Sequence, residues 1–172
     1  MLKVLGCVLT ASGCMGLGLW YRQQYNGRLH HIRLLVAILD MMMSEVRYSK
    51  ATLPECCGRL ADRLEEPYRS SFTKIWEQMC SNMGKSFAEL FCGEMKDCLK
   101  QTQTGKEERE LFLEFAGGCG YEDSAMQLIS MEQYRERLRQ LQEKLEKEVL
   151  EKGKLAVSLG TLGGLLLIII LL

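Results

Sequence analysis

The side chains that could do chemistry in this sequence are few and poorly grouped. The two histidines, His30 and His31, are adjacent, so on a helix their rings point about 100° apart and are poorly placed to share a ligand. Solvated or headgroup-facing histidines are the simpler interpretation. The phosphate-loop, GxSxG and HExxH motifs are absent from the sequence. No catalytic residue is predicted, and the protein is expected not to be an enzyme.

The eight cysteines have no spacing typical of a metal site. None belongs to a Cys-x2-Cys pair, and the adjacent Cys56 and Cys57 cannot easily close one site together. Most are interpreted as small apolar core residues, which a reducing cytosol would keep as thiols, whereas an oxidising compartment could pair them as disulfides. The glycines of 117–120 precede no lysine and follow a helical segment, which favours a turn over a phosphate loop. No metal or cofactor is predicted.

Charge is distributed unevenly along the 172 residues. The 22 basic and 22 acidic side chains cancel, which gives no reason to expect a nucleic acid as a partner. All acidic residues lie between Asp40 and Glu151, and all basic residues except Lys3 lie within 22–154. Two uncharged segments remain, 4–21 and 155–172, each close to the ~20 residues that cross a bilayer. They predict transmembrane helices over 1–21 and 155–172, with the lipid bilayer as a partner.

The first apolar segment has a competing interpretation as a cleaved signal. Ala11-Ser12-Gly13-Cys14 faintly resembles a lipoprotein cleavage site. However, the apolar run continues past Cys14, and Trp20-Tyr21-Arg22 has the aromatic-then-basic order of a membrane interface. An uncleaved helix is therefore favoured.

Basic residues near the two predicted spans indicate the orientation. Lys3 lies on the outer side, and seven basic residues lie on the side of the middle domain: Arg22, Arg28, Arg33, Lys144, Lys147, Lys152 and Lys154. The positive-inside rule then places the middle domain in the cytoplasm and both termini on the extracytoplasmic side.

Both predicted spans carry small residues at every fourth position. Such a stripe forms a groove in which a second helix can approach closely, although glycine is also simply common in membrane helices. Packing of the spans against each other or against another protein is the favoured interpretation. The stripes consist of Gly6, Thr10, Cys14 and Gly18 in the first span and Ala156, Gly160 and Gly164 in the second.

Residues 22–154 are expected to form one cytoplasmic helical bundle. Apolar residues recur every three or four positions from Arg28 to Lys50. Further helices are predicted to start at Thr52 and Ser86, each with a glutamate three residues later as a capping box, and at Pro67 and Lys106. The polar segment 101–105 and the glycines of 117–120 are expected breaks. The predicted fold class is all-α, an antiparallel bundle of about six helices flanked by an N-terminal and a C-terminal transmembrane helix.

The last helix is expected to start at Asp123 or Ser124 and to be the longest. Its flanking positions are nearly all charged or glutamine, and it can run on into the second span because Gly153 is the only weak point between them. The apolar positions resemble the seam of a coiled coil, which could be buried in the bundle or dock another helix. These seam residues are Met131, Tyr134, Leu138, Leu141, Leu145 and Val149.

Short motifs follow one another in a characteristic order. Leu34-Leu35-x-Ala37-Ile38-Leu39 precedes Ser44-Glu45-Val46-x-Tyr48, and Thr52-Leu53-Pro54-Glu55 with Arg59-Leu60-Ala61 comes next; Lys154-Leu155 and Leu159-Gly160-x-Leu162-x-Gly164 close the chain. Over essentially its whole length the chain resembles the stage III sporulation protein AB family of endospore-forming bacteria. Two features depart from that family. Ala51-Thr52-Leu53-Pro54 moves the proline of the family's Thr-Pro-Leu turn, and segment 92–104 matches nothing recognisable.

The resemblance implies a non-enzymatic role in a channel complex built between mother cell and forespore. The family's helical domain is similar to the cytoplasmic domain of type II secretion F (GspF), a secretion platform protein that works beside an ATPase. By this analogy the implied partners are other membrane subunits of the sporulation channel and the cytoplasmic ATPase of the same operon. The implied location is the mother-cell membrane surrounding the forespore. No nucleic acid and no small-molecule substrate are implied.

Two hypotheses follow for how the protein contacts its partners. As a platform or coupling subunit, it would use the helix junction formed by Glu45, Tyr48, Thr52, Pro54 and Glu55, although a turn and a helix cap is the favoured interpretation of these residues. As a membrane-anchored adaptor or regulator, it would dock a partner through the coiled-coil-like helix of residues 124–151.

Overall fold

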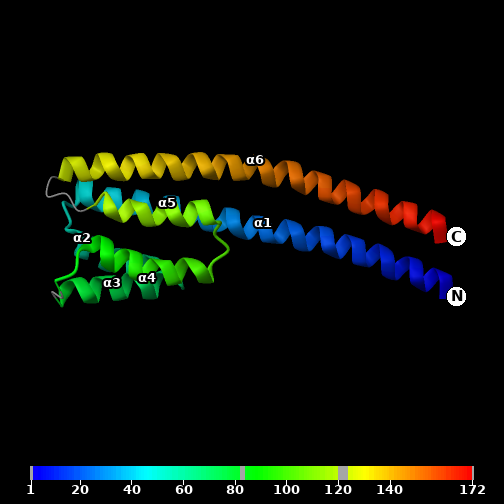
Figure 1. The fold of residues 1–172 in the computed structure, drawn as a ribbon, viewed down its shortest axis with the longest axis horizontal. Helices are drawn as coiled ribbons and strands as arrows, with labels where there is room; N and C mark the ends of the chain where they lie inside the picture. Colours follow the sequence, from blue (N-terminus) through cyan, green and yellow to red (C-terminus); the bar gives the residue numbers. More distant parts are fainter. Residues whose placement is uncertain (1, 82–83, 120–123, 172) are drawn as a thin grey trace. The chain divides into compact units, whose positions relative to one another are not determined.

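The computed structural model describes residues 2–81, 84–119 and 124–171, and over most of 2–24 and 153–171 it describes the helix but not the side chains. The described residues form six α-helices and no strand. This confirms the predicted all-α class. The helices, shown in Figure 1, are α1 (Leu2–Tyr48), α2 (Leu53–Arg63), α3 (Tyr68–Cys80), α4 (Phe87–Gln101), α5 (Lys106–Gly117) and α6 (Ser124–Leu171).

The chain divides into two compact units. One consists of Met1–Leu29 and Glu143–Leu172, and the other of His30–Gln142. In the first unit the Lys152 ammonium lies 5.3 Å from the centre of the Tyr25 ring and 3.1 Å from Glu148 Oε2, so it joins side chains of α1 and α6. The predicted boundaries at residues 22 and 154 mark where the chain would enter the membrane. The division into two units does not test this, so these boundaries stay a prediction.

The predicted bundle of about six helices agrees with the six helices that the described residues form. The two flanking segments do not form separate helices in these residues. Helices α1 and α6 each continue without a break from a predicted span into the second unit (Figure 1). The reason is that Gly27 and Gly153 are the weakest helix formers at these two borders, and one interior glycine costs only about 1 kcal/mol.

The predicted transmembrane helices fall largely on residues whose side chains are not described. In the part of the chain that the structure does describe, no helix is both long enough and apolar enough to cross a bilayer. The small-residue stripes also lie outside the described side chains, so their packing stays a prediction. These are Gly6, Thr10, Cys14, Gly18, Ala156, Gly160 and Gly164.

Local sequence signals start two of the short helices as predicted. Helix α2 begins after Thr52, whose backbone N–H donates to Glu55 Oε2 at 2.8 Å. Helix α4 begins after Ser86, whose N–H donates to Glu89 Oε2 at 2.9 Å while its hydroxyl accepts from Glu89 N at 3.3 Å. Each pair satisfies backbone N–H groups that a helix start leaves unbonded. Both predicted capping boxes are confirmed.

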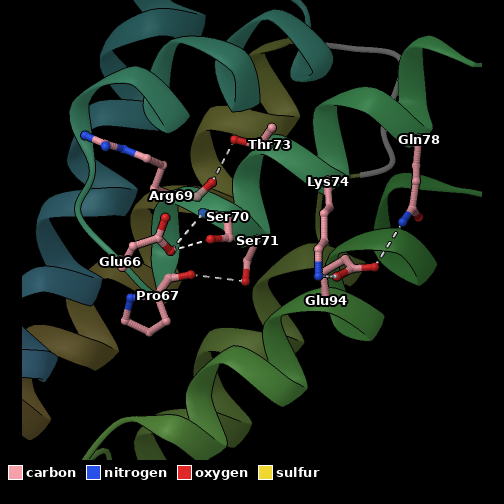
Figure 2. A network of polar contacts seen from close by, with 9 residues as sticks. All are labelled: Glu66, Pro67, Arg69, Ser70, Ser71, Thr73, Lys74, Gln78 and Glu94. Carbon is pink, nitrogen blue, oxygen red and sulfur yellow. Dashed lines mark hydrogen bonds and ion pairs between the residues drawn. The ribbon is translucent and has the colours of Figure 1, made fainter.

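Helix α3 is tied to α4 and at its own start by polar side chains (Figure 2). At its start, Glu66 accepts a hydrogen bond from the Ser70 hydroxyl. Further along, Glu94 of α4 accepts from Gln78 Nε2 at 2.9 Å and lies 3.9 Å from Lys74 Nζ. These contacts lie at the protein surface, and they hold α3 in one register along α4.

Aromatic side chains fill the core of the second unit. Phe91 of α4 lies at the centre, with ring centroids 5.3–6.1 Å from those of Phe72, Phe87, Phe112 and Phe115. These five are all the phenylalanines of the sequence, and all are buried. Edge-to-face and tilted ring pairs at such distances are favourable beyond the apolar area that they bury.

The heptad-like seam of α6 is largely buried. Met131 and Leu138 are fully buried and Leu145 is 4% exposed, while Tyr134, Leu141 and Val149 are half-buried. The buried positions of the seam therefore serve the protein's own packing and are not free to dock another coiled coil.

Candidate functional site

The junction between α1 and α2 is a tight turn. Helix α1 ends at Tyr48, and Lys50 adopts a φ of +49°, in the left-handed region that side chains other than glycine rarely occupy. This turn lets both Ser49 N and Ala51 N donate to the carbonyl oxygen of Glu45, at 3.1 and 3.2 Å. The carbonyl oxygen of Glu45 therefore accepts hydrogen bonds both from the residue after α1 and from the residue after the turn.

The side chain of Glu45 holds the next helix. It is 6% exposed; its Oε2 accepts a hydrogen bond from Arg59 Nη1 at 2.5 Å, and its Oε1 forms an ion pair with Arg63 Nη2 at 3.2 Å. The two arginines are four residues apart, on adjacent turns of α2. The hydrogen bond from Arg59 is the largest cause that lowers the pKa of the Glu45 carboxyl below its ordinary value. The carboxylate is therefore charged at neutral pH and fixes both guanidinium groups.

The predicted contact residues have different surroundings. Tyr48 is 78% exposed, whereas Glu45 is buried under the two arginines. Thr52 and Glu55 are exposed and form the capping box, and Pro54 is half-buried at the second position of α2. The structure thus gives Glu45, Thr52, Pro54 and Glu55 clear roles in the turn and cap, and leaves Tyr48 as the candidate that faces solvent. Contact with a partner stays a prediction for all five.

Arg59 and Arg63 are the residues of this junction that the sequence analysis missed. Their side chains are 48% and 56% exposed although both pair with a buried carboxylate. The four-residue spacing on the polar side of an amphipathic helix was a visible signal. It did not point to Glu45, because that residue lies on another helix. Tyr48 ends α1 and the exposed Lys50 lies in the turn that leads into α2, both within five residues of Glu45. We call Tyr48, Lys50, Arg59 and Arg63 the basic junction patch.

A cleft lies where α5 meets α6. There the Arg137 guanidinium lies 5.6 Å from the centre of the Tyr134 ring and 3.9 Å from Glu114 Oε2. A Cβ added to Gly118 would come within 2.1 Å of Ser130 Oγ, so the helices meet closely here. Arg137 is already engaged by the Tyr134 ring and by Glu114, so this cleft is a weaker candidate for a binding site than the α1–α2 junction.

The histidines and cysteines do not form a site in the described residues. His31 Nδ1 lies 3.4 Å from the Tyr68 hydroxyl, and burial followed by the charge of His30 lowers the pKa of His31. Four cysteines (Cys56, Cys57, Cys98 and Cys119) are buried, as predicted for core residues. Within residues 2–81, 84–119 and 124–171, no three His, Cys, Asp or Glu side chains gather as metal ligands.

Comparisons with known proteins agree with the resemblance read from the motifs. The model of the stage III sporulation protein AB family matches residues 3–172. Stage III sporulation protein AB of Bacillus subtilis (strain 168) is 27% identical over 173 residues, which cover 99% of each chain. A solved structure of stage III sporulation protein AB (SpoIIIAB) has a TM-score of 0.65 at 20% identity and covers 72% of this chain and 97% of its own, which shows the shared fold. Because the match extends over almost every residue, this chain belongs to the stage III sporulation protein AB family.

Proposed function

We propose that this protein is a non-enzymatic membrane platform, or coupling subunit, of the channel complex between mother cell and forespore. Membership of the family gives it a role in sporulation. The observation that carries the proposal is that the family match includes both uncharged end segments as well as the helical bundle. Such a protein would be anchored at both ends and would present its bundle to partners.

In this proposal the partners are other membrane subunits of the channel and the cytoplasmic ATPase of the same operon. The bundle supports a coupling role because its outer contacts are polar and its aromatic core is tightly packed, which suits an element that transmits force without rearranging. The adaptor alternative loses its main support, because the seam residues Met131 and Leu138 are fully buried.

The experiment that tests this function is purification of the tagged full-length chain from sporulating cells in a mild, uncharged detergent. The expected result is a chain of full-length intact mass together with an ATPase and channel membrane proteins in fixed ratios. An unrelated tagged protein with two spans is the control for nonspecific capture. A shortened, lipid-modified chain without these companions would contradict the proposal.

The proposed two-span topology has its own test. Alkaline phosphatase, which is active only outside the cytoplasm, is fused after Leu172 or inserted at Gln103, an exposed residue of the α4–α5 loop. The fusion at Leu172 is expected to be active and the insertion at Gln103 inactive, with equal protein levels. The reverse pattern, or activity at both sites, would overturn the orientation.

A further inference from the structure

We propose that the basic junction patch (Tyr48, Lys50, Arg59 and Arg63) binds a short acidic segment of a partner protein. This inference rests on the proposed function, because it names the chemistry of a partner of the coupling subunit. The ligand class is a peptide segment that offers two or more carboxylates beside an apolar or aromatic side chain.

The first reason is an excess of positive charge that is fixed in place. Two guanidinium groups share the single carboxylate of Glu45, and Arg59 and Arg63 each use one nitrogen for it. A guanidinium has five N–H donors, so both arginines keep donors for a further acceptor. Among the described residues, no other carboxylate lies within ion-pair distance of either arginine in the structure. The neighbouring Glu55 is engaged with Thr52 N, 2.8 Å away.

The second reason is that the two arginines are already held before a partner arrives. Glu45 is buried and pairs with both guanidinium groups, so less of their side-chain freedom is left for binding to remove. Tyr48, at the end of α1, has 78% of its surface exposed. Tyrosine and arginine are the residue types that most often dominate protein–protein binding.

The third reason concerns the size of the ligand. The unit His30–Gln142 contains 15 basic and 18 acidic residues, so its net charge is −3. Exposed acidic side chains also follow the patch along α2 and beyond, at Asp62, Glu65 and Glu66. An extended polyanion such as nucleic acid or an anionic bilayer would meet these carboxylates, whereas a short acidic segment can contact the arginines alone. The charges therefore favour a peptide over a membrane surface.

The direct test uses the full-length chain in uncharged detergent and a fluorescein-labelled hexaglutamate peptide, followed by anisotropy. The variant K50E/R63E is expected to weaken binding at least about tenfold, since it reverses two charges of the patch. The matched control K85E/K96E reverses two exposed charges elsewhere in the same unit and is expected to leave the affinity unchanged. Binding should also weaken as salt is raised.

Two further variants separate binding from folding. Tyr48→Ala and Lys50→Glu each alter an exposed side chain that takes no part in the Glu45 ion pairs. Both variants are expected to keep the melting temperature of the unchanged chain and to bind the hexaglutamate peptide more weakly. Equal affinity of patch and control variants would overturn the proposal. Equal binding of hexalysine would overturn it too. Displacement of the peptide by phosphatidylglycerol vesicles at equal charge concentration would overturn it in favour of a lipid ligand.

A genetic test identifies the partner's chemistry in cells. Suppressors of the sporulation defect of K50E/R63E are selected, and Asp or Glu to Lys or Arg changes in another protein are expected. Suppressors confined to this chain would contradict the proposal. If the peptide binds but no ATPase is purified with the chain, the proposed function fails and the patch stands. If the ATPase is purified but patch and control variants behave alike, only the patch fails.

Discussion

Glu45 is the residue on which the α1–α2 junction depends. It is buried, it accepts a hydrogen bond from Arg59 and forms an ion pair with Arg63 of α2, and its backbone carbonyl accepts from the residues that follow α1. Its pKa is lowered by the hydrogen bond from Arg59 first and by the nearby arginine charges as well. Any change at Glu45 therefore affects the turn and the orientation of both arginines together.

The stability that Glu45 contributes should depend on pH. Because its folded-state pKa lies below the ordinary value of 4.5, this contribution is complete above pH 4.5 and is lost as the pH falls through the lowered pKa. Glu45→Gln is expected to melt several degrees lower than the unchanged chain at pH 7 and to approach it as the pH falls through the lowered pKa of Glu45. Thermal unfolding of both full-length chains across this range measures the difference. A constant difference over all pH values would contradict the pairing.

The cysteines should differ sharply in reactivity. Burial raises the pKa of the Cys56 thiol to about 11 and that of Cys119 to about 12, so both stay protonated and shielded at neutral pH. Cys80 is exposed at the end of α3. We expect N-ethylmaleimide at pH 7.5 to label Cys80 within minutes and the buried thiols only after denaturation, as mapped by peptide mass spectrometry. Rapid labelling of Cys119 in the folded chain would contradict this packing.

At the scale of the helices, two glycines should respond oppositely to alanine. A Cβ on Gly118 would lie 2.1 Å from Ser130 Oγ and 3.3 Å from Tyr134 Cε2, whereas a Cβ on Gly93 in α4 would meet nothing within 4 Å. Gly118→Ala is expected to destabilise the protein by about 1–3 kcal/mol through overpacking. Gly93→Ala is the matched control, expected to stabilise it by about 0.5–1 kcal/mol because alanine favours a helix interior.

Urea unfolding of the full-length chains, followed by circular dichroism, gives both free energies of unfolding. The two changes add the same methyl group, so a difference in sign isolates the effect of the α5–α6 contact. Equal effects of the two alanines would mean that the α5–α6 junction has room for a side chain, contrary to the structure.

At the scale of the whole molecule, Phe91 joins three helices into one core. Its ring contacts those of Phe72 on α3 and of Phe112 and Phe115 on α5. Phe91→Ala is expected to lower the free energy of unfolding by about 3–5 kcal/mol, because it leaves a cavity between those helices. Phe91→Leu should have a smaller effect, because it refills much of that cavity. A loss under about 1 kcal/mol for the alanine variant would show that the aromatic cluster is not the stabilising centre.

Much of the fold could be predicted from the sequence because the signals for it are local. The capping boxes at Thr52 and Ser86 act between residues three positions apart, and the apolar periodicity decides which face of each helix is buried. The glycines at the end of α5 similarly end that helix within one turn. Family membership was also visible in the order of short motifs, and the comparisons confirm it.

The sequence alone was thus enough to predict the short helices, the starts of α2 and α4 and much of the core. It was not enough for every apolar position, since Trp76 of α3 is 41% exposed. The tertiary structure alone decided that Glu45 meets Arg59, fourteen residues away on another helix. That meeting depends on the turn at Lys50, where a lysine with positive φ has no sequence signal. It also decided that α1 continues unbroken from Leu2 to Tyr48, and that Met131 and Leu138 of the α6 seam are fully buried. Pairing and burial depend on how helices pack, and packing energies outweigh the small local preferences that a sequence displays.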